Sequence, residues 1–271
     1  MPPQSHTFSP IPPFRVYYGA MDNAPALALA SQSPRRRMML AWLGLPFTVT
    51  DGEVDEAPVE GESPPALAAR LAAEKAVRAA ASVASGWVLT ADTVVDLDGH
   101  TLGKPADAAE AQAMLERLRD RPHQVHTAVA LVWSTTHAGG TPRSVPTPPL
   151  LSGIRVVSTN VVMRRYTDAE IAAYIATSDP FDKAGAYAIQ HPGFHPVAGC
   201  HVCYANVVGL PLCAVVRLLK EAEARISESE NRRIGEGMPN AWHIEDDVPA
   251  LCLRHFGYTC PAPDEGIGIT E

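Results

Sequence analysis

The sequence has few cysteines, no long apolar run and no excess of positive charge, and each of these shortages excludes a class of protein. Five cysteines in 271 residues are too few for a disulfide framework. The longest stretch without a charged residue, 184–216, contains three prolines and three histidines, so it does not suit a membrane span of about 20 apolar residues. The first 14 residues lack basic and apolar regions, which predicts no signal peptide. We therefore expect a cytoplasmic protein with no membrane partner.

The negative charge is unevenly distributed. The chain has 22 Lys and Arg against 30 Asp and Glu, a net charge of -8. Residues 221–271 hold 11 acidic and 4 basic side chains, whereas the first 220 residues hold 19 acidic and 18 basic ones. The acidity therefore belongs to the C-terminal tail. The nearly neutral remainder offers little of the basic surface that nucleic-acid binding requires, so no nucleic-acid partner is expected.

The composition is that of a globular protein, with 46% hydrophobic and 19% charged residues. Residues 1–25 contain six prolines and are interpreted as a poorly ordered arm. Four prolines mark 135–152 as an insertion between two strands. We expect the main domain to span 26–222, followed by an acidic extension over 223–271. That extension is interpreted either as a short docked helix or as a partner-binding segment.

Strands and helices alternate along the main domain. Strands are expected at 26–30, 47–51, 87–97, 125–133, 155–163, 186–190 and 197–208. Helices are expected at 35–43, 66–84, 107–118, 168–177 and 211–224. Asp98-Gly99 predicts a hairpin turn. The alternation indicates an α/β fold, and the hairpins make its sheet mixed.

A hydroxyl-rich and arginine-rich turn opens the first helix. Ser33 precedes Pro34 as an N-cap, and arginines at the positive end of a helix dipole are disfavoured unless an anion lies between them. Ser31, Ser33, Arg35 and Arg36 therefore suggest a phosphate cradle. The alternative is a solvated basic turn with a capping serine.

Asp92 lies inside the apolar run Val88–Val95. A carboxylate in a buried strand is costly unless it meets a metal, a cation or hydrogen-bond donors. Glu56, which like Asp55 lies in a loop before a helix, could supply a second carboxylate for a divalent cation. The alternative is that the strand ends near Ala91 and that Asp92 bonds to turn backbone.

A third group of polar residues follows the hairpin. Lys104 lies on the stiff Gly-Lys-Pro connection, where it could hold a phosphate, although an exposed turn lysine fits as well. Gln190 ends an apolar segment that begins after Lys183, and its amide suits the edge of a pyrimidine ring. A buried glutamine bonded to backbone is the ordinary alternative.

Cys200 and Cys203 form a single CxxC motif. A structural zinc site needs four ligands, and no second CxxC follows. Two packing cysteines are therefore favoured over a metal site.

Together these segments resemble the Maf family of nucleoside triphosphate pyrophosphatases. The matching segments are LALASQSPRRRMML at 27–40, the Asp55-Glu56 loop, LAAEKA at 71–76, LTADTVVDLDGHTLGKP at 89–105, FDKAGAYAIQ at 181–190 and NVVGLPL at 206–212. The resemblance implies an elongated α/β fold of the Maf and ITPase type. Its central, mixed, twisted sheet is flanked by helices, with two lobes around a cleft. A homodimer is a further expectation.

The resemblance also implies an activity and roles for individual residues. The activity is hydrolysis of a nucleoside triphosphate between its α and β phosphates with Mg or Mn, and the DKAGAYxIQ form is similar to the branch acting on dTTP and UTP. Asp92 would activate water and, with Glu56, would lie near the metal. The implied phosphate-binding residues are Ser31, Ser33, Arg35, Arg36 and Lys104. Lys75 and Lys183 would line the cleft, and the positions tied to base choice would be Arg36, Thr93 and Gln190.

Two other hypotheses remain at this point. One keeps the reaction but changes the substrate to a modified nucleotide. The other is a non-catalytic nucleotide- or nucleic-acid-binding regulator of cell division that would use the arginines at 35–37. The chain departs from the family pattern at Ala188, at His191, at 118–122 and at 199–205, and these departures affect fine substrate choice more than the reaction.

Overall fold

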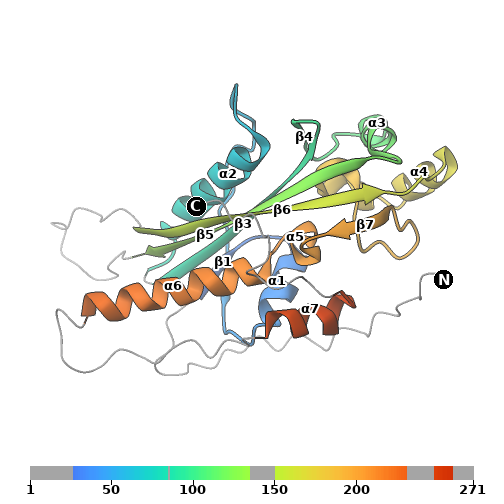
Figure 1. Ribbon diagram of the computed structural model, residues 1–271. Coiled ribbons are helices and arrows are strands. Elements are labelled where there is room, and N and C mark those ends of the chain that lie inside the picture. The colour runs from blue at the N-terminus through green and yellow to red at the C-terminus, as the bar shows by residue number, and fades with distance from the viewer. Residues whose placement is uncertain (1–26, 85, 135–149, 231–246, 259–271) are drawn as a thin grey trace.

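The computed structural model describes residues 27–84, 86–134, 150–230 and 247–258 (Figure 1). The expected arm at 1–25, most of the expected insertion at 135–152 and much of the tail beyond residue 230 lie outside these residues. Within the described ranges, no helix is both long enough and apolar enough to cross a membrane.

A seven-stranded mixed sheet forms the centre of the molecule. Its strands, in spatial order, are β2 (Thr48–Thr50), β1 (Leu27–Ala30), β3 (Gly86–Leu97), β5 (Pro122–Ser134), β6 (Leu150–Met163) and β7 (Val197–His201), with β4 (His100–Leu102) paired to β3. β1 runs parallel to β2 and β3, and the other pairs are antiparallel. The mixed α/β sheet expected from the sequence is confirmed.

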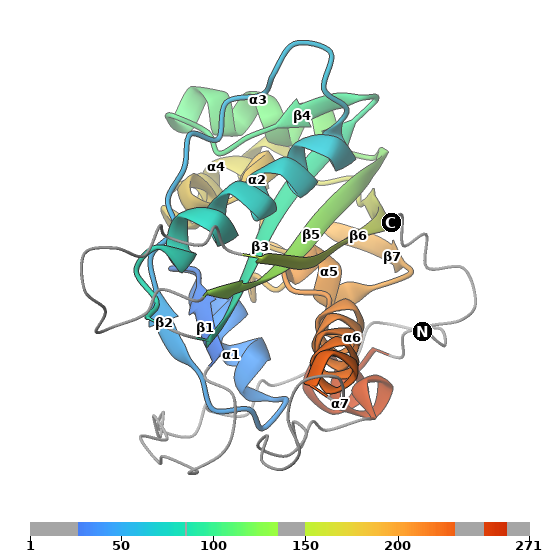
Figure 2. The same ribbon diagram turned by 90° about the vertical axis from the view of Figure 1, so that its left-hand side faces the viewer.

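Alternating side chains of the strands bury the two faces of this sheet against different helices. Leu29 and Leu89 face α1 (Pro34–Ala41) and α6 (Leu212–Glu230), whereas Ala28 and Val88 face α2 (Pro64–Ala80). Figure 1 shows α2 above the sheet and α6 below it, and in Figure 2 α2 crosses the face turned toward the viewer. The two-residue period of a strand is the reason that one apolar run serves both faces.

The face opposite α2 carries two separate apolar clusters. One gathers around α1, α6 and α5 (Tyr204–Val208), and the other around α3 (Ala108–Leu118) and α4 (Asp168–Ile175). The two clusters lie toward opposite ends of β3, with Leu89 in the first and Leu97 in the second. They form the two lobes between which the functional site lies.

The helix starts expected near 34, 107 and 168 are confirmed, whereas α2 begins at Pro64, two residues before the expected start at 66. Ser33 caps α1 by accepting a hydrogen bond from the Arg36 N–H at 3.4 Å, and Asp107 caps α3. Thr167 and Glu170 form a reciprocal capping box on α4. Each cap satisfies a backbone N–H that the first turn of a helix leaves without a partner.

Two expected strands are wrong in part or in full. Residues 186–190 are not a strand: the short 3-10 turn η2 (Ala184–Ala186) comes first, and 189–190 form a turn. Gly185 and Ala186 have positive φ angles of 70° and 59°, which a strand cannot accommodate. The strand expected at 197–208 ends at His201, because Val202 also has a positive φ, and α5 follows.

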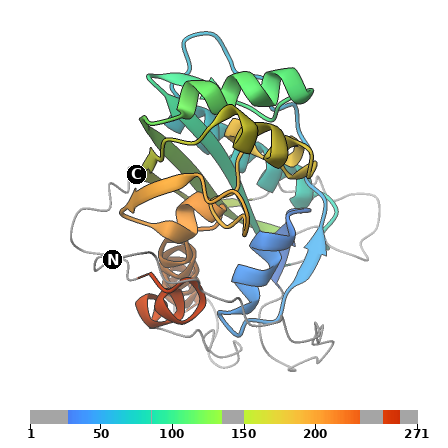
Figure 3. The ribbon, with the colours of Figure 1, turned by 90° about the vertical axis from the view of Figure 1, so that its right-hand side faces the viewer.

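The tail contributes a docked helix, α7 (Val248–Phe256). This agrees with the first of the two interpretations of the extension, a short docked helix. Val248, Leu251 and Cys252 are buried in the same cluster as α1 and α6. His255 stacks on Trp42 with ring centroids 4.0 Å apart. Figure 3 shows α7 at the same end of the molecule as α1 and α6. The acidic tail is therefore attached to the core by an apolar helix.

A buried histidine makes the stability of this fold depend on pH. His123 on β5 is 4% exposed, its Nε2 lies 2.8 Å from the Tyr187 hydroxyl, and its Nδ1 has no hydrogen-bond partner among the described residues. Burial lowers the pKa of His123 from 6.5 to about 4, against the opposing charge of Asp96. Because the unfolded chain binds this proton more readily, the stability due to neutral His123 is present above pH 6.5 and is lost as the pH falls toward 4.

We expect the free energy of unfolding of the unaltered protein to fall by about 2 kcal/mol more than that of His123→Gln between about pH 7.5 and about pH 5. Urea unfolding at both pH values measures this difference. The control is His100→Gln, an exposed position on β4, which should keep the slope of the unaltered protein. Parallel slopes for His123→Gln and the unaltered protein would contradict the assignment.

Candidate active site

A cleft of about 1090 Å³ lies between the two lobes. Its walls come from the β1–α1 turn, the loop after β2, one side of α2, the middle of β3, the connection after β4 and residues 181–190. The residues expected to serve the reaction or bind the substrate and metal all line it, namely Ser31, Ser33, Arg35, Arg36, Glu56, Lys75, Asp92, Thr93, Lys104, Lys183 and Gln190. Ligand pockets commonly have volumes of roughly 300–1,000 Å³, so this cleft has room for a nucleotide.

The β1–α1 turn brings hydroxyl, amide and guanidinium groups to one wall. The Ser31 hydroxyl accepts a hydrogen bond from the Ser33 N–H at 3.2 Å, and Ser33 in turn caps α1. Arg35 makes no ion pair with any described acidic residue, so its guanidinium is available to an anion. The capping role of Ser33 is thus compatible with a phosphate cradle, because both use the free N–H groups of the first turn.

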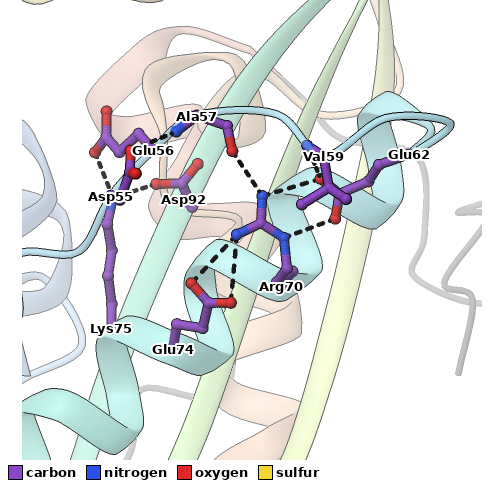
Figure 4. Close-up of polar contacts among 9 residues, drawn as sticks. All are labelled: Asp55, Glu56, Ala57, Val59, Glu62, Arg70, Glu74, Lys75 and Asp92. Atoms are coloured by element: carbon purple, nitrogen blue, oxygen red, sulfur yellow. Dashed lines mark hydrogen bonds and ion pairs between the residues drawn. The ribbon is translucent and has the colours of Figure 1, made fainter.

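Asp92 lies in the middle of β3, which continues to Leu97, so the interpretation that the strand ends near Ala91 is wrong. The residue is 6% exposed. Its Oδ1 accepts a short hydrogen bond from the Lys75 ammonium, which also contacts Glu56 Oε1 at 2.7 Å (Figure 4). Within the described residues, Asp92 Oδ2 has no hydrogen-bond partner. Lys75 is therefore the cation that allows Asp92 to be buried as a carboxylate.

Glu56 joins two cations across the mouth of the cleft. Its Oε2 lies 3.0 Å from the Lys104 ammonium, while Oε1 contacts Lys75. Burial acts to raise the pKa of Glu56, but the hydrogen bonds and charges of the two lysines outweigh it and lower the pKa from 4.5 to about 2. Glu56 is consequently ionised at neutral pH. Asp55 instead turns away and accepts a hydrogen bond from the Ala57 N–H at 3.0 Å.

Two features not predicted from the sequence hold the Glu56 loop against α2. A Cβ at Gly52 would lie 2.7 Å from the Lys75 carbonyl oxygen, so only glycine permits this approach. Arg70 on α2 pairs with Glu62 at 2.8 Å and donates to the Ala57 carbonyl at 3.0 Å (Figure 4). The aspartate-glycine pair at 51–52 was a signal for the first feature. The second required the three-dimensional structure.

The acidic pair fits a hard divalent cation such as Mg or Mn. Two carboxylates already converge on one positive group, and hard cations prefer such oxygen ligands. In the part of the chain that is described, no group of three or more His, Cys, Asp or Glu side chains could hold a metal ion. Asp92 and Glu56 would thus need phosphate oxygens to complete the coordination sphere. The CxxC motif gains no support as a zinc site from the described residues.

Arg36 lies on the α1 wall, close to β3 and α5. Its Nε donates to the Gly209 carbonyl at 2.8 Å, and one terminal nitrogen donates to the Thr93 hydroxyl at 3.0 Å. Gly209 has a φ of 115° and a virtual Cβ 3.3 Å from the Thr93 hydroxyl, so glycine is needed both for its backbone and for this contact. The guanidinium keeps three N–H donors for a ligand.

Lys183 and Gln190 lie on the opposite wall. The Lys183 ammonium contacts the Asp179 carbonyl at 2.6 Å, the Asp179 carboxylate at 2.9 Å and the Asp182 carboxylate at 2.5 Å. These three bonds occupy all its donors, so Lys183 anchors the 181–190 segment. Gln190 is half-buried at the end of that segment, where it lines the cleft.

The comparisons with known proteins agree over the same region. The family model described as Maf-like protein matches residues 26–222. A protein of Thermomicrobium roseum named dTTP/UTP pyrophosphatase is 47% identical over 209 residues, which cover 77% of this chain and 89% of the relative. A protein of the same name from Myxococcus xanthus is 46% identical over 196 residues, covering 72% and 92%.

A solved structure described as a HAM1 protein from Coxiella burnetii aligns with a TM-score of 0.34 and 20% identity, covering 53% of this chain and 75% of that one. This likeness is too slight to carry an argument. The sequence relatives and the family model do carry one. Their match spans most of this chain and nearly the full length of the relatives. The chain therefore belongs to the family of Maf-like proteins.

Proposed function

We propose that this chain is a nucleoside triphosphate pyrophosphatase that hydrolyses dTTP and UTP between the α and β phosphates. The observation that carries the proposal is the arrangement of the cleft. A nearly buried carboxylate faces it beside a second carboxylate, and arginine and lysine side chains line it on both sides. The names of the curated relatives support the choice of dTTP and UTP.

Asp92 is the proposed proton acceptor. Its Oδ1 is held by Lys75. Its Oδ2 is left to accept a proton from a water molecule as that water attacks the α-phosphorus of the nucleotide. The bond between phosphorus and the bridging oxygen then breaks, and pyrophosphate leaves. The proton taken by Asp92 is released to solvent after the products depart.

The cations of the cleft would stabilise the charge that develops on the leaving pyrophosphate. Arg35 and Arg36, with Ser31 and Ser33, lie on one wall. Lys104 also lines the cleft and lies next to Glu56. A Mg or Mn ion held by Asp92 and Glu56 would polarise the phosphate oxygens. Because the protein offers these two carboxylates alone for this ion within the described residues, we propose that the metal enters together with the nucleotide.

Base choice is assigned to the region around Gln190, Thr93 and Arg36. Gln190 offers an amide donor and an acceptor, which match the carbonyl and N–H groups on the edge of a pyrimidine ring. A nucleoside triphosphate as substrate also agrees with a cytoplasmic enzyme that removes unwanted nucleotides from the pool.

The test is a pyrophosphate-release assay on purified protein with Mg or Mn and a panel of canonical and modified triphosphates. We expect turnover of dTTP and UTP to exceed that of ATP and GTP, with the nucleoside monophosphate and pyrophosphate as the products. Release of inorganic phosphate with a nucleoside diphosphate would contradict the proposed bond cleavage. A preference for a modified nucleotide would revise the substrate alone.

A further inference from the structure

A network of hydrogen bonds runs from Arg36 and Thr93 in the cleft wall to buried residues beneath it. It links Arg36 to Thr93 at 3.0 Å, Thr93 to the Thr127 hydroxyl at 2.9 Å, and Thr127 to the Asn206 carbonyl oxygen at 2.8 Å. Thr127 and Asn206 are both 0% exposed. Neither residue lines the cleft.

Counting protons sets the direction of every hydrogen bond in this network. The Thr127 hydroxyl has one hydrogen, which it donates to the Asn206 carbonyl, so toward Thr93 it can only accept. Thr93 must then donate its own hydrogen to Thr127. Its lone pairs accept from Arg36, whose guanidinium can only donate. Thr93 therefore has no hydrogen left for a substrate.

Asn206 fixes the buried end of this network. Its side-chain Oδ1 accepts from the Thr127 N–H at 3.1 Å, and its Nδ2 donates to the Val125 carbonyl at 2.8 Å and the Thr159 hydroxyl at 2.9 Å. These bonds attach α5 to both β5 and β6. The same segment ends at Gly209, whose carbonyl accepts from Arg36 Nε. Arg36 is thus held twice by one rigid unit.

We propose that Thr127 and Asn206 are positioning residues for Arg36, acting through the Thr93 hydroxyl. They fix the lone pairs of Thr93 toward the guanidinium, so that the three remaining N–H donors of Arg36 point to the bound nucleotide. This inference rests on the proposed function and deepens it. It assigns to Thr93 the role of an acceptor for Arg36 and removes it from the donors that could contact a base.

Steady-state kinetics of Thr127→Val with dTTP tests the inference. Valine keeps the shape of threonine and removes the hydroxyl. We expect KM to rise about tenfold, which corresponds to the loss of one hydrogen bond to a charged group. We expect kcat to change less than about twofold. Thr127→Ser restores the hydroxyl and should return KM to within about twofold of the unaltered protein.

Thr90→Val is the matched control. Thr90 is also fully buried on β3, and its hydroxyl donates to the Ala72 carbonyl at 2.6 Å, on the face away from Arg36. It should lower the thermal midpoint as Thr127→Val does while leaving KM unchanged. Equal KM values for Thr127→Val and the unaltered protein, or an equal rise for Thr90→Val, would overturn the inference.

A double-mutant cycle separates positioning from a general loss of structure. If Thr127 acts through Thr93, the double variant Thr93→Val/Thr127→Val should have the KM of Thr93→Val alone, because the second change has nothing left to act on. Additive increases in KM would instead show two independent effects and overturn the proposed route.

Binding of a non-hydrolysable α,β-methylene analogue of dTTP keeps this test distinct from that of the proposed function. If the unaltered protein binds the analogue but releases no pyrophosphate from dTTP, and Thr127→Val weakens binding about tenfold, the proposed function fails and the positioning role stands. If pyrophosphate is released normally and the two proteins bind the analogue equally, the positioning role fails alone.

Discussion

Asp92→Asn is expected to lower kcat for pyrophosphate release about 10³-fold or more, because the amide cannot accept the proton of the attacking water. Asparagine has nearly the same shape, and it can still accept the Lys75 hydrogen bond through its side-chain oxygen. We therefore expect the fold to be retained. A coupled pyrophosphate assay, with thermal unfolding as the check on folding, measures the effect.

Asp55→Asn is the matched control for this variant. Asp55 lies beside Glu56 in the same loop, but its carboxylate accepts from the Ala57 N–H and does not line the cleft. Its activity should stay within about twofold of the unaltered protein, as expected for a surface substitution. If Asp92→Asn kept a tenth or more of the activity, the assignment of Asp92 as proton acceptor would be wrong.

Lys75→Met is expected to have the second-largest effect, on both activity and stability. The Lys75 ammonium bonds to Asp92 and to Glu56, and its side chain is 13% exposed while that of Asp92 is 9% exposed. Removing it leaves a nearly buried carboxylate without its cation, which costs about 3 kcal/mol in free energy of unfolding. We expect kcat/KM to fall about 10²-fold, because Asp92 also loses its orienting partner.

Urea unfolding and steady-state kinetics check this prediction, with Arg78→Met as the control. Arg78 is exposed one turn further along α2, so its replacement changes the same charge on the same helix without touching the cleft. Adding Asp92→Asn to Lys75→Met should recover part of the lost stability, because no unpaired charge then remains. A double variant that is less stable than Lys75→Met would show that the ion pair is not the source of the loss.

Local signals were sufficient for much of the fold. The caps at Ser33, Asp107 and Thr167 and the turn at Asp98-Gly99 depend on side chains and backbone groups within a few residues. The position of Asp92 in a buried strand likewise followed from the apolar residues on either side of it. Such features are readable because the atoms that decide them are neighbours along the chain.

The misread segment at 186–190 shows where this local reasoning fails. Its apolar residues favour a strand, but the bonds of Lys183 to Asp179 and Asp182 and the positive φ angles at Gly185 and Ala186 impose a turn. Burial against the α3–α4 cluster then covers the same apolar side chains without any ladder of hydrogen bonds. Packing thus outweighed strand propensity, which is a weak and context-dependent preference.

The sequence by itself determined which residue types would line the cleft, and it separated the acidic tail from the nearly neutral body that carries them. Only the tertiary structure decided how those residues work together. It placed Lys75 between Asp92 and Glu56, joined Arg36 to Asn206 through two threonines, and docked the tail by α7 onto Trp42. The reason is physical: these contacts join residues far apart in the chain, and their geometry exists only after the sheet and its helices have packed.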